Sequence, residues 1–462
     1  MRRIVVAALI LVSTGCTGRT VQSPLAVSHA ALDSIAERGR NEIGLPGVSV
    51  VIMHGRTIVL ARGYGVADRE AGAAATPETI YAIGSLSKQF TAAAIMRLVE
   101  ESRIRLEEPV STYLPDYLPG RMPVPTIRNL LLQNSGLPEW DGLPEMQDID
   151  TGDPTRFELP RMVGVIARQP PLYRAGDWWS YSNSNYTVLA AVIERVTGKS
   201  YDEYLASTLF EPLGLTSTGG CASARVPSGS QRAVGYQDKN SYALRPLSRI
   251  KARSNTGTGG LCSSAVDLAM WMRALVDGKA VTRGSLRAMT TAAPVRAGFT
   301  PPYGFGLSLL PLAGQEAVWH AGVTAGYTAV LAYLPGRDLI ISSVANARYA
   351  RLQSIVKDFV RELLRLPEPR LHDLPIDRSQ AERVTGNYDD GMFKFRISTT
   401  GAQLFLDVPE FGTPKRLLHQ GDGEFATARP DDIRLRFEPA IGAVQRIVWE
   451  WGELRAYGRR VP

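Results

Sequence analysis

Residues 83–100 read IGSLSKQFTAAAIMRLVE, a turn at residues 83–84 followed by a segment that is apolar on almost every face. A helix with that distribution is a buried one, so we expect a central helix from Ser85 to Glu100. Its first residues form a Ser-x-x-Lys sequence. Because residues three apart on a helix share a face, the amine of Lys88 can reach the hydroxyl of Ser85.

The pair of Ser85 and Lys88 has the parts of a covalent catalyst. A buried lysine near the positive N-terminus of a helix should have a lowered pKa, so that its amine can accept the serine proton. The same N-terminus offers backbone N–H groups to a developing oxyanion. The competing interpretation is that Ser85 only caps the helix and that Lys88 is solvated.

Two other Ser-x-x-Lys sequences make the tetrapeptide a weak indication by itself. They lie at residues 248–251, in an Arg-rich stretch, and at residues 354–357, within an amphipathic segment. Only Ser85 follows a turn and opens a deeply apolar helix. Ser85 is therefore the candidate nucleophile.

Two further polar groups point to the same chemistry. Tyr181-Ser182-Asn183 is the only Tyr-x-Asn of the chain. Its phenol can pass a proton to a leaving group, and its amide can hold a substrate carbonyl. His320-Ala321-Gly322 precedes two late strands, and its glycine lets the backbone approach a substrate closely. Taken singly, the Tyr-x-Asn motif could be a polar turn before a helix, and the histidine of the His-x-Gly motif could be structural. Another His-x-Gly, at residues 419–421, falls near the C-terminus.

In this order, Ser-x-x-Lys, Tyr-x-Asn and His-x-Gly resemble the motifs of the penicillin-recognising serine hydrolases, particularly the class C β-lactamase-like family. The resemblance extends from about Leu45 to Ala347. It implies that Ser85 is the nucleophile, that Lys88 is its general base and that Tyr181 acts in proton transfer.

The resemblance also implies a set of substrate-binding residues. Asn183 would bind substrate, while His320 and Gly322 would line the opposite strand. The backbone N–H groups of Ser85 and Val323 would form the oxyanion hole.

The sequence departs from this family in two places that bear on the substrate. Class C β-lactamases carry Lys in the third motif, whereas this chain has His320, which is mostly neutral at neutral pH. Carboxylate-bearing lactams should therefore be held less firmly, unless an arginine substitutes for that lysine. Gln133 replaces a histidine that the family often places before Ser-Gly.

The expected function is that of a serine hydrolase of amide or ester bonds. We rank D-amino-acid peptides first, as in a D-amino-acid peptidase or carboxypeptidase-like enzyme of the cell envelope, then esters, then β-lactams. A non-catalytic envelope-binding protein is the alternative from another class. No metal or other cofactor is expected, because the three cysteines and five histidines show no metal-ligand spacing.

The N-terminus is typical of an exported protein. Two arginines, the apolar run from Ile4 to Val12 and small residues make residues 1–22 a predicted signal peptide. Gly15-Cys16 resembles a lipoprotein cleavage site, although Ser13 stands where such sites carry an aliphatic residue. We therefore expect a periplasmic location or the outer surface of a bacterial membrane, with tethering through a lipidated Cys16 as an open alternative.

The rest of the chain suggests two folded units. Strands are expected within residues 47–60 and at 329–334 and 339–344, and helices at 23–39, 188–197, 201–210, 266–275 and 352–364. One antiparallel sheet assembled from both ends, flanked by helices and beside a helical lobe, gives an α+β fold for residues 23–366. The resemblance implies that this fold is β-lactamase/transpeptidase-like. After a Pro-rich linker at 367–377, short alternating runs predict a small β-barrel or sandwich at 378–462. The resemblance implies a small all-β, lipocalin-like barrel there, like the one that some members of the family append.

Composition fits a globular protein and gives no sign of nucleic-acid binding. Hydrophobic residues make up 44% and charged residues 21% of the 462 residues. The net charge of +7, from 52 basic and 45 acidic residues, is not gathered into a basic run. Cys221 and Cys262 could pair or remain two buried thiols.

Overall fold

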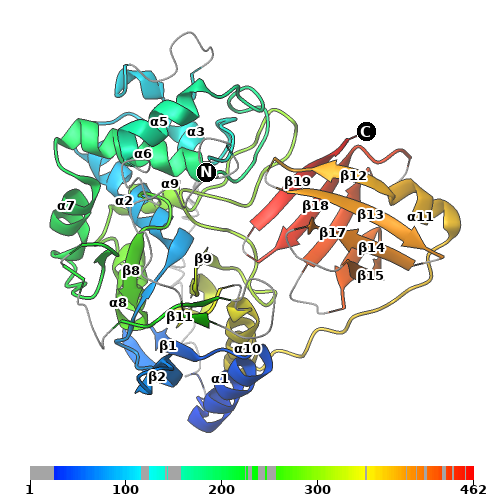
Figure 1. The fold of residues 1–462 in the computed structure, drawn as a ribbon, viewed down its shortest axis with the longest axis horizontal. Coiled ribbons are helices and arrows are strands. Elements are labelled where there is room, and N and C mark those ends of the chain that lie inside the picture. Colours follow the sequence, from blue (N-terminus) through cyan, green and yellow to red (C-terminus); the bar gives the residue numbers. More distant parts are fainter. Residues whose placement is uncertain are drawn as a thin grey trace, which may run out of the picture.

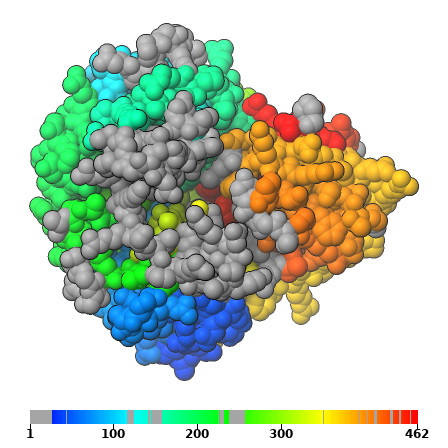
Figure 2. Space-filling view, viewed as in Figure 1, coloured from blue at the N-terminus to red at the C-terminus, as the bar shows by residue number. Residues whose placement is uncertain are grey.

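The computed structural model shows a larger mixed body and a β-barrel beside it, in contact with each other (Figures 1 and 2). It describes residues 25, 27–115, 124–140, 143, 158–223, 225–226, 232–237, 245–246, 256–348, 351–391, 393–401, 403–409, 414–428, 433–439, 442–452 and 454–461. The predicted signal peptide, with Cys16, lies outside the described residues. None of the helices described is both long and apolar enough to cross a membrane.

The main sheet combines strands from both ends of the larger body, as predicted. Its six antiparallel strands run in the order β3 (Ala73–Ala74), β2 (Thr57–Asp68), β1 (Gly47–His54), β11 (Leu339–Ala345), β10 (Tyr327–Leu334) and β9 (Val318–Thr324). At its centre, Val48 of β1 lies opposite Ala345 of β11 and His54 lies opposite Leu339. The strand order places β9, which carries the His-x-Gly motif, at one edge of the sheet.

Alternate residues of β1 build two separate cores, because successive side chains of a strand point to opposite faces. Val50 and Ile52 belong to one buried cluster, and Val51 and Met53 belong to the other. The helices that pack on the first face are α1 (His29–Ile43) and α10 (Leu352–Leu364), and α8 (Ala265–Val276) packs on the second.

Helix α1 lies further along the chain than the predicted 23–39. The Ser28 side chain accepts a hydrogen bond from the N–H of Ala31 at 3.3 Å, which fixes the start of the helix at His29. Gly44, with φ of +72°, ends it in the left-handed region that glycine adopts without strain.

The helical lobe surrounds α2 (Ser87–Glu100), which is buried along most of its length. Its other helices are α3 (Ile127–Leu131), α5 (Leu159–Arg168), α6 (Asn183–Thr197), α7 (Tyr201–Leu205), which runs into a π-helical turn at Ala206–Phe210, and α9 (Arg283–Met289). The prediction that α2 begins at Ser85 was wrong by two residues. Ser85 lies in a 3₁₀ turn, Gly84–Leu86, that leads into the helix.

A three-stranded sheet joins the lobe to the main sheet and contains β4 (Ile80–Ala82), β8 (Leu261–Ser264) and β5 (Gly219–Gly220). Strand β4 leads directly into the 3₁₀ turn. The residues just before β8 reach the side chain of Lys88, as described below. The small sheet therefore positions both the 3₁₀ turn and the residues that contact Lys88.

The C-terminal unit is a closed eight-stranded antiparallel barrel, preceded by α11 (Arg378–Val384). Its strands are β12 (Gly386–Asp389), β13 (Lys394–Thr400), β14 (Gln403–Asp407), β15 (Lys415–Gly421), β16 (Glu424–Thr427), β17 (Ile433–Glu438), β18 (Arg446–Trp451) and β19 (Leu454–Val461). In β17, Leu435 and Phe437 fill the interior while Arg434 and Arg436 point outward. The predicted α+β fold followed by a small all-β barrel is confirmed.

Candidate active site

The amine of Lys88 lies at the centre of the candidate site. Its side chain is fully buried, and Nζ lies 3.0 Å from Oγ of Ser85. Two other oxygens also accept hydrogen bonds from it: the side-chain oxygen of Asn183 at 2.7 Å and the backbone oxygen of Thr258 at 3.0 Å. The structure thus brings the first two sequence motifs together around one nitrogen.

This arrangement suits a general base. As an ammonium, Lys88 donates its three protons to these three oxygens. In the neutral amine, two protons stay with Asn183 and Thr258, whose oxygens only accept. The remaining lone pair then faces the Ser85 hydroxyl, so the amine can take the serine proton along an existing contact.

Tyr181 borders the same amine. Its ring centroid lies 4.8 Å from Nζ of Lys88, and the residue is only 6% exposed. Tyr181 lies two residues before α6, and Asn183 is the first residue of that helix. The sequence prediction that Ser85, Lys88, Tyr181 and Asn183 meet in one place therefore agrees with the geometry.

Gln133 holds the Tyr-x-Asn segment in place. Its side-chain oxygen accepts hydrogen bonds from the N–H of Ser182 at 3.0 Å and from Nδ2 of Asn185 at 2.6 Å. Its backbone oxygen accepts a third from the N–H of Ser180 at 3.2 Å. The sequence showed Gln133 only as a departure from the family pattern, without predicting this role.

The turn before Ser85 lies close against β9. A Cβ at Gly84, whose φ is +52°, would lie 2.8 Å from the backbone nitrogen of Val323. A Cβ at Gly322 would lie 2.0 Å from the carbonyl oxygen of Ile83 and 3.0 Å from the backbone nitrogen of Ser85. Only glycine allows this approach, which brings the turn and β9 together at Ser85 and Val323, the two residues whose N–H groups the resemblance assigns to an oxyanion hole.

His320 lies fully buried on β9 and is held as a neutral ring. Its Nδ1 lies 2.5 Å from the carbonyl oxygen of Ala321, which only accepts, so Nδ1 carries the proton. The hydroxyl of Tyr303, 3.0 Å from Nε2, then donates to that nitrogen. Burial and the nearby charge of Lys88 lower the pKa of His320 to about 3. The ring therefore supplies no positive charge for a substrate.

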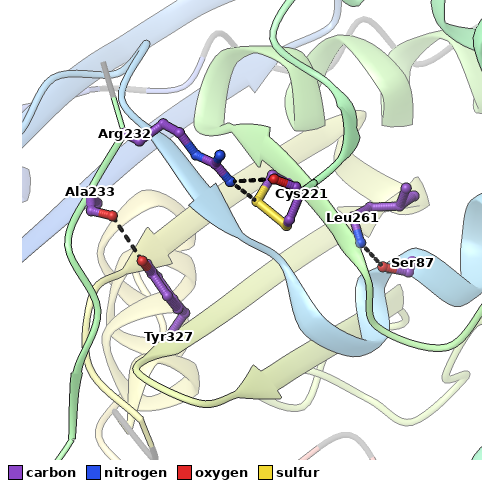
Figure 3. Close-up of a disulfide and its surroundings, with 7 residues drawn as sticks. Ser87, Cys221, Arg232, Ala233, Leu261 and Tyr327 are labelled. Carbon is purple, nitrogen blue, oxygen red and sulfur yellow. Dashed lines mark hydrogen bonds between the residues drawn. A yellow bond between two sulfur atoms is a disulfide. The ribbon is translucent and has the colours of Figure 1, made fainter. Parts of the chain in front are cut away.

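A disulfide fixes β8, the strand that follows the residues in contact with Lys88. Cys221 pairs with Cys262 of β8, which settles the alternative that the sequence left open (Figure 3). The guanidinium of Arg232 donates to the carbonyl of Cys221 at 2.9 Å. The neighbouring Leu261 N–H donates to Oγ of Ser87 at 3.2 Å, tying β8 to the start of α2 (Figure 3).

Comparisons with known proteins agree with this geometry. The Beta-lactamase family model matches residues 32–364. The putative penicillin-binding protein PbpX of Bacillus subtilis (strain 168) is 30% identical over 327 residues, which are 70% of this chain and 76% of PbpX.

Two other similar proteins were found. The D-aminopeptidase of Brucella ovis is 28% identical over 287 residues, 61% of this chain and 52% of that enzyme, so the match spans about half of its length. Among solved structures, the octameric penicillin-binding protein homologue from Pyrococcus abyssi has a TM-score of 0.68 and 25% identity, over 93% of this chain and 100% of that one.

Proposed function

This chain belongs to the Beta-lactamase family of serine hydrolases, and on that premise we propose that it cleaves D-amino-acid amides or peptides through an acyl-enzyme on Ser85. The observation that carries this proposal is the contact of one buried amine with the Ser85 hydroxyl and two fixed acceptors. A solvated lysine beside a helix cap would not be buried in this way.

In the proposed first step, Oγ of Ser85 attacks the substrate carbonyl and its proton passes to Nζ of Lys88. The carbonyl electrons move onto the oxygen, where the N–H groups of Ser85 and Val323 stabilise the negative charge. When the tetrahedral intermediate collapses, the carbon–nitrogen bond breaks and the amine leaves with a proton delivered through Tyr181. Water then attacks the acyl-enzyme by the reverse of these transfers and releases the acid.

The state of His320 supports a narrower substrate class. A β-lactam, or a peptide with a free terminal carboxylate at this position, would be held more firmly by a cation in the third motif. Nδ1 of His320 is directed to Ala321 and Nε2 accepts from Tyr303, so the ring has neither charge nor a free donor. We therefore place amides and esters without a carboxylate at that position ahead of carboxypeptidase and β-lactam substrates. The similarity to a D-aminopeptidase supports the D-configuration.

We also propose that the protein is exported to the cell envelope. The composition of residues 1–22 supports this, and so does the disulfide between Cys221 and Cys262, since such bonds persist in oxidising compartments. A lipid anchor on Cys16 would hold the enzyme at a membrane surface.

A substrate panel tests the proposal. Purified wild type and Ser85→Ala would be given a D-alanine nitroanilide, its L-isomer, a nitrophenyl ester, a peptide ending in D-Ala-D-Ala and a chromogenic cephalosporin. We expect turnover of the D-anilide and the ester that is lost in Ser85→Ala. The L-isomer, the carboxylate peptide and the cephalosporin should react more slowly.

Two outcomes would contradict the proposal. Absence of turnover on every substrate would favour a binding protein. Preference for the cephalosporin or the carboxylate peptide would mean that another group supplies the charge that His320 lacks.

A further inference from the structure

The barrel contacts the larger body at the segment that carries Tyr181. One buried apolar cluster joins side chains of both units: Trp179, Tyr181, Val295, Tyr303, Val448, Leu454 and Tyr457. Figure 1 shows β18 and β19 on the side of the barrel that faces the larger body. A candidate catalytic residue therefore lies within the contact between the two units.

The polar centre of this contact is Asp390, in the turn after β12. It is 4% exposed, and its carboxylate accepts hydrogen bonds from Nε1 of Trp449 at 2.8 Å and from the N–H of Phe393 at 2.7 Å. Its backbone oxygen accepts a hydrogen bond from Oγ of Ser180 at 3.1 Å. Strand β18 thus fixes the turn, and the turn binds the residue before Tyr181.

Gly391 makes this approach close. Its φ is +89°, and a Cβ at this position would lie 2.7 Å from Oγ of Ser180. The N–H of Gly391 donates to the carboxylate of Asp389 at 2.7 Å, which holds the turn in this shape. With any larger side chain, either the turn or the Ser180 side chain would have to shift.

Ser180 is consequently held from two sides. Its N–H donates to the backbone oxygen of Gln133 in the larger body, and its hydroxyl donates to Asp390 in the barrel. The preceding Trp179 ring lies 5.9 Å from the Tyr303 ring and 6.4 Å from the Tyr457 ring of β19, measured between centroids. The backbone that enters Tyr181 is thus fixed partly by the barrel.

From these contacts we infer that the barrel is a positioning element of the active site. Asp390 and Gly391, in the turn after β12, hold Ser180 and thereby orient the phenol of Tyr181 for proton transfer to the leaving group. This inference rests on the proposed function. A misplacement of about 1 Å at a catalytic group can cost about 100-fold in rate, so a contact behind Tyr181 can control the reaction.

The choice of leaving group separates positioning from a general structural effect. An anilide leaves only when its nitrogen is protonated, whereas a nitrophenolate leaves without a proton. Loss of correct placement at Tyr181 should therefore slow acylation by the anilide and spare acylation by the ester.

The experiment measures single-turnover acylation of the full chain by a D-amino-acid nitroanilide and by the matching nitrophenyl ester. Ser180→Ala removes the hydrogen bond to the barrel, and Trp449→Phe removes the donor that holds Asp390. Each is made in the wild type and in Tyr181→Phe. We expect each variant to slow the anilide about tenfold and the ester less than about twofold, with no further loss in Tyr181→Phe.

Ser285→Ala is the matched control. It also removes a buried serine hydrogen bond, to Oε1 of Glu100 at 2.5 Å, but between α9 and α2. It should leave the anilide-to-ester ratio unchanged. If Trp449→Phe does not fold, Ser180→Ala decides alone, since it leaves the barrel core intact.

Equal losses on both substrates, or losses that add to that of Tyr181→Phe, would overturn the inference and leave the barrel a structural partner. Failure of the proposed function gives a different result: either the wild type is acylated by neither substrate, or acylation persists in Ser85→Ala.

Discussion

The hydroxyl of Tyr303 donates a hydrogen bond to Nε2 of His320, 3.0 Å away, deep inside the protein. This bond completes the fixation of the ring, because Nδ1 already donates to Ala321. It gives the third motif a neutral group in place of a lysine. The substrate preference that we propose depends on this pair.

Tyr303→Phe should destabilise the protein and keep the ring buried. Removing the donor from a buried acceptor costs about 1–3 kcal/mol, so we expect a loss in the free energy of unfolding of that size. Urea denaturation measures it. Tyr113→Phe is the control, because the hydroxyl of Tyr113 accepts from Arg105 near the surface. A larger loss in the control would contradict the role of the Tyr303–His320 bond.

His320 should make stability depend on pH. Its pKa is about 3 when folded and about 6.5 when unfolded, so the unfolded chain binds an extra proton between these values. The free energy of unfolding should therefore fall as the pH drops, by about 1.5–2 kcal/mol between pH 6.5 and 5.

The comparison of wild type with His320→Gln isolates this contribution. The carboxyls of Asp202 and Asp267, whose pKa values are raised by burial, act in the opposite direction but are present in both proteins. Urea titrations at each pH should show that the free energy of unfolding of the variant falls less steeply as the pH drops. Parallel pH profiles for the two proteins would mean that His320 is not held neutral.

Lys88→Gln should abolish most of the acylation, because the serine loses its proton acceptor. General-base assistance contributes about 100- to 10,000-fold, and we expect a loss of that order in kcat/KM for the anilide. Lys357→Gln is the matched control, since Lys357 closes another Ser-x-x-Lys, in α10. Comparable losses in both variants would remove Lys88 from the mechanism.

Gly322→Ala should separate β9 from the turn before Ser85. Its Cβ would lie 2.0 Å from the carbonyl oxygen of Ile83, so one of the two backbones must move. Displacing a donor of an oxyanion hole costs about 100- to 1,000-fold in kcat, which steady-state kinetics would detect. Gly336→Ala, with nothing within 4 Å of the added carbon, should have wild-type activity.

Reduction of the disulfide should lower the free energy of unfolding and leave the fold unchanged. Cys221 and Cys262 are 41 residues apart, and closing a loop of this size contributes about 3–4 kcal/mol. The double variant Cys221→Ser, Cys262→Ser should reproduce the loss and no longer respond to reductant. An unchanged urea midpoint on reduction of the wild type would contradict this pairing.

Local patterns were sufficient to predict the strands within residues 47–60 and at 329–334 and 339–344, and the buried helix α2, whereas the catalytic roles came from the family resemblance. The run of apolar residues after Ser85 predicted the helix. The 3₁₀ turn was not predicted, because its geometry follows from the contact of Gly84 with β9. Helix α10 was predicted with its observed bounds, since its amphipathic period is regular.

The residues that support the site were harder to foresee. Gln133 has an unusual φ of +63°, and its hydrogen bonds are made with a segment some 50 residues later in the chain. Tyr303 follows two prolines and carries no periodic signal. The hydrogen bond between Ser180 and Asp390 joins residues 210 positions apart, a separation that no local pattern spans. Such contacts are made by tertiary packing and become visible only in the structure.

The most direct test is to identify the residue that becomes acylated. The wild type would be treated with a fluorophosphonate probe and digested, and its peptides would be analysed by mass spectrometry. We predict one modified residue, Ser85, with no labelling of Ser85→Ala and strongly slowed labelling of Lys88→Gln. Labelling at another serine, or equal labelling of wild type and Ser85→Ala, would contradict the mechanism.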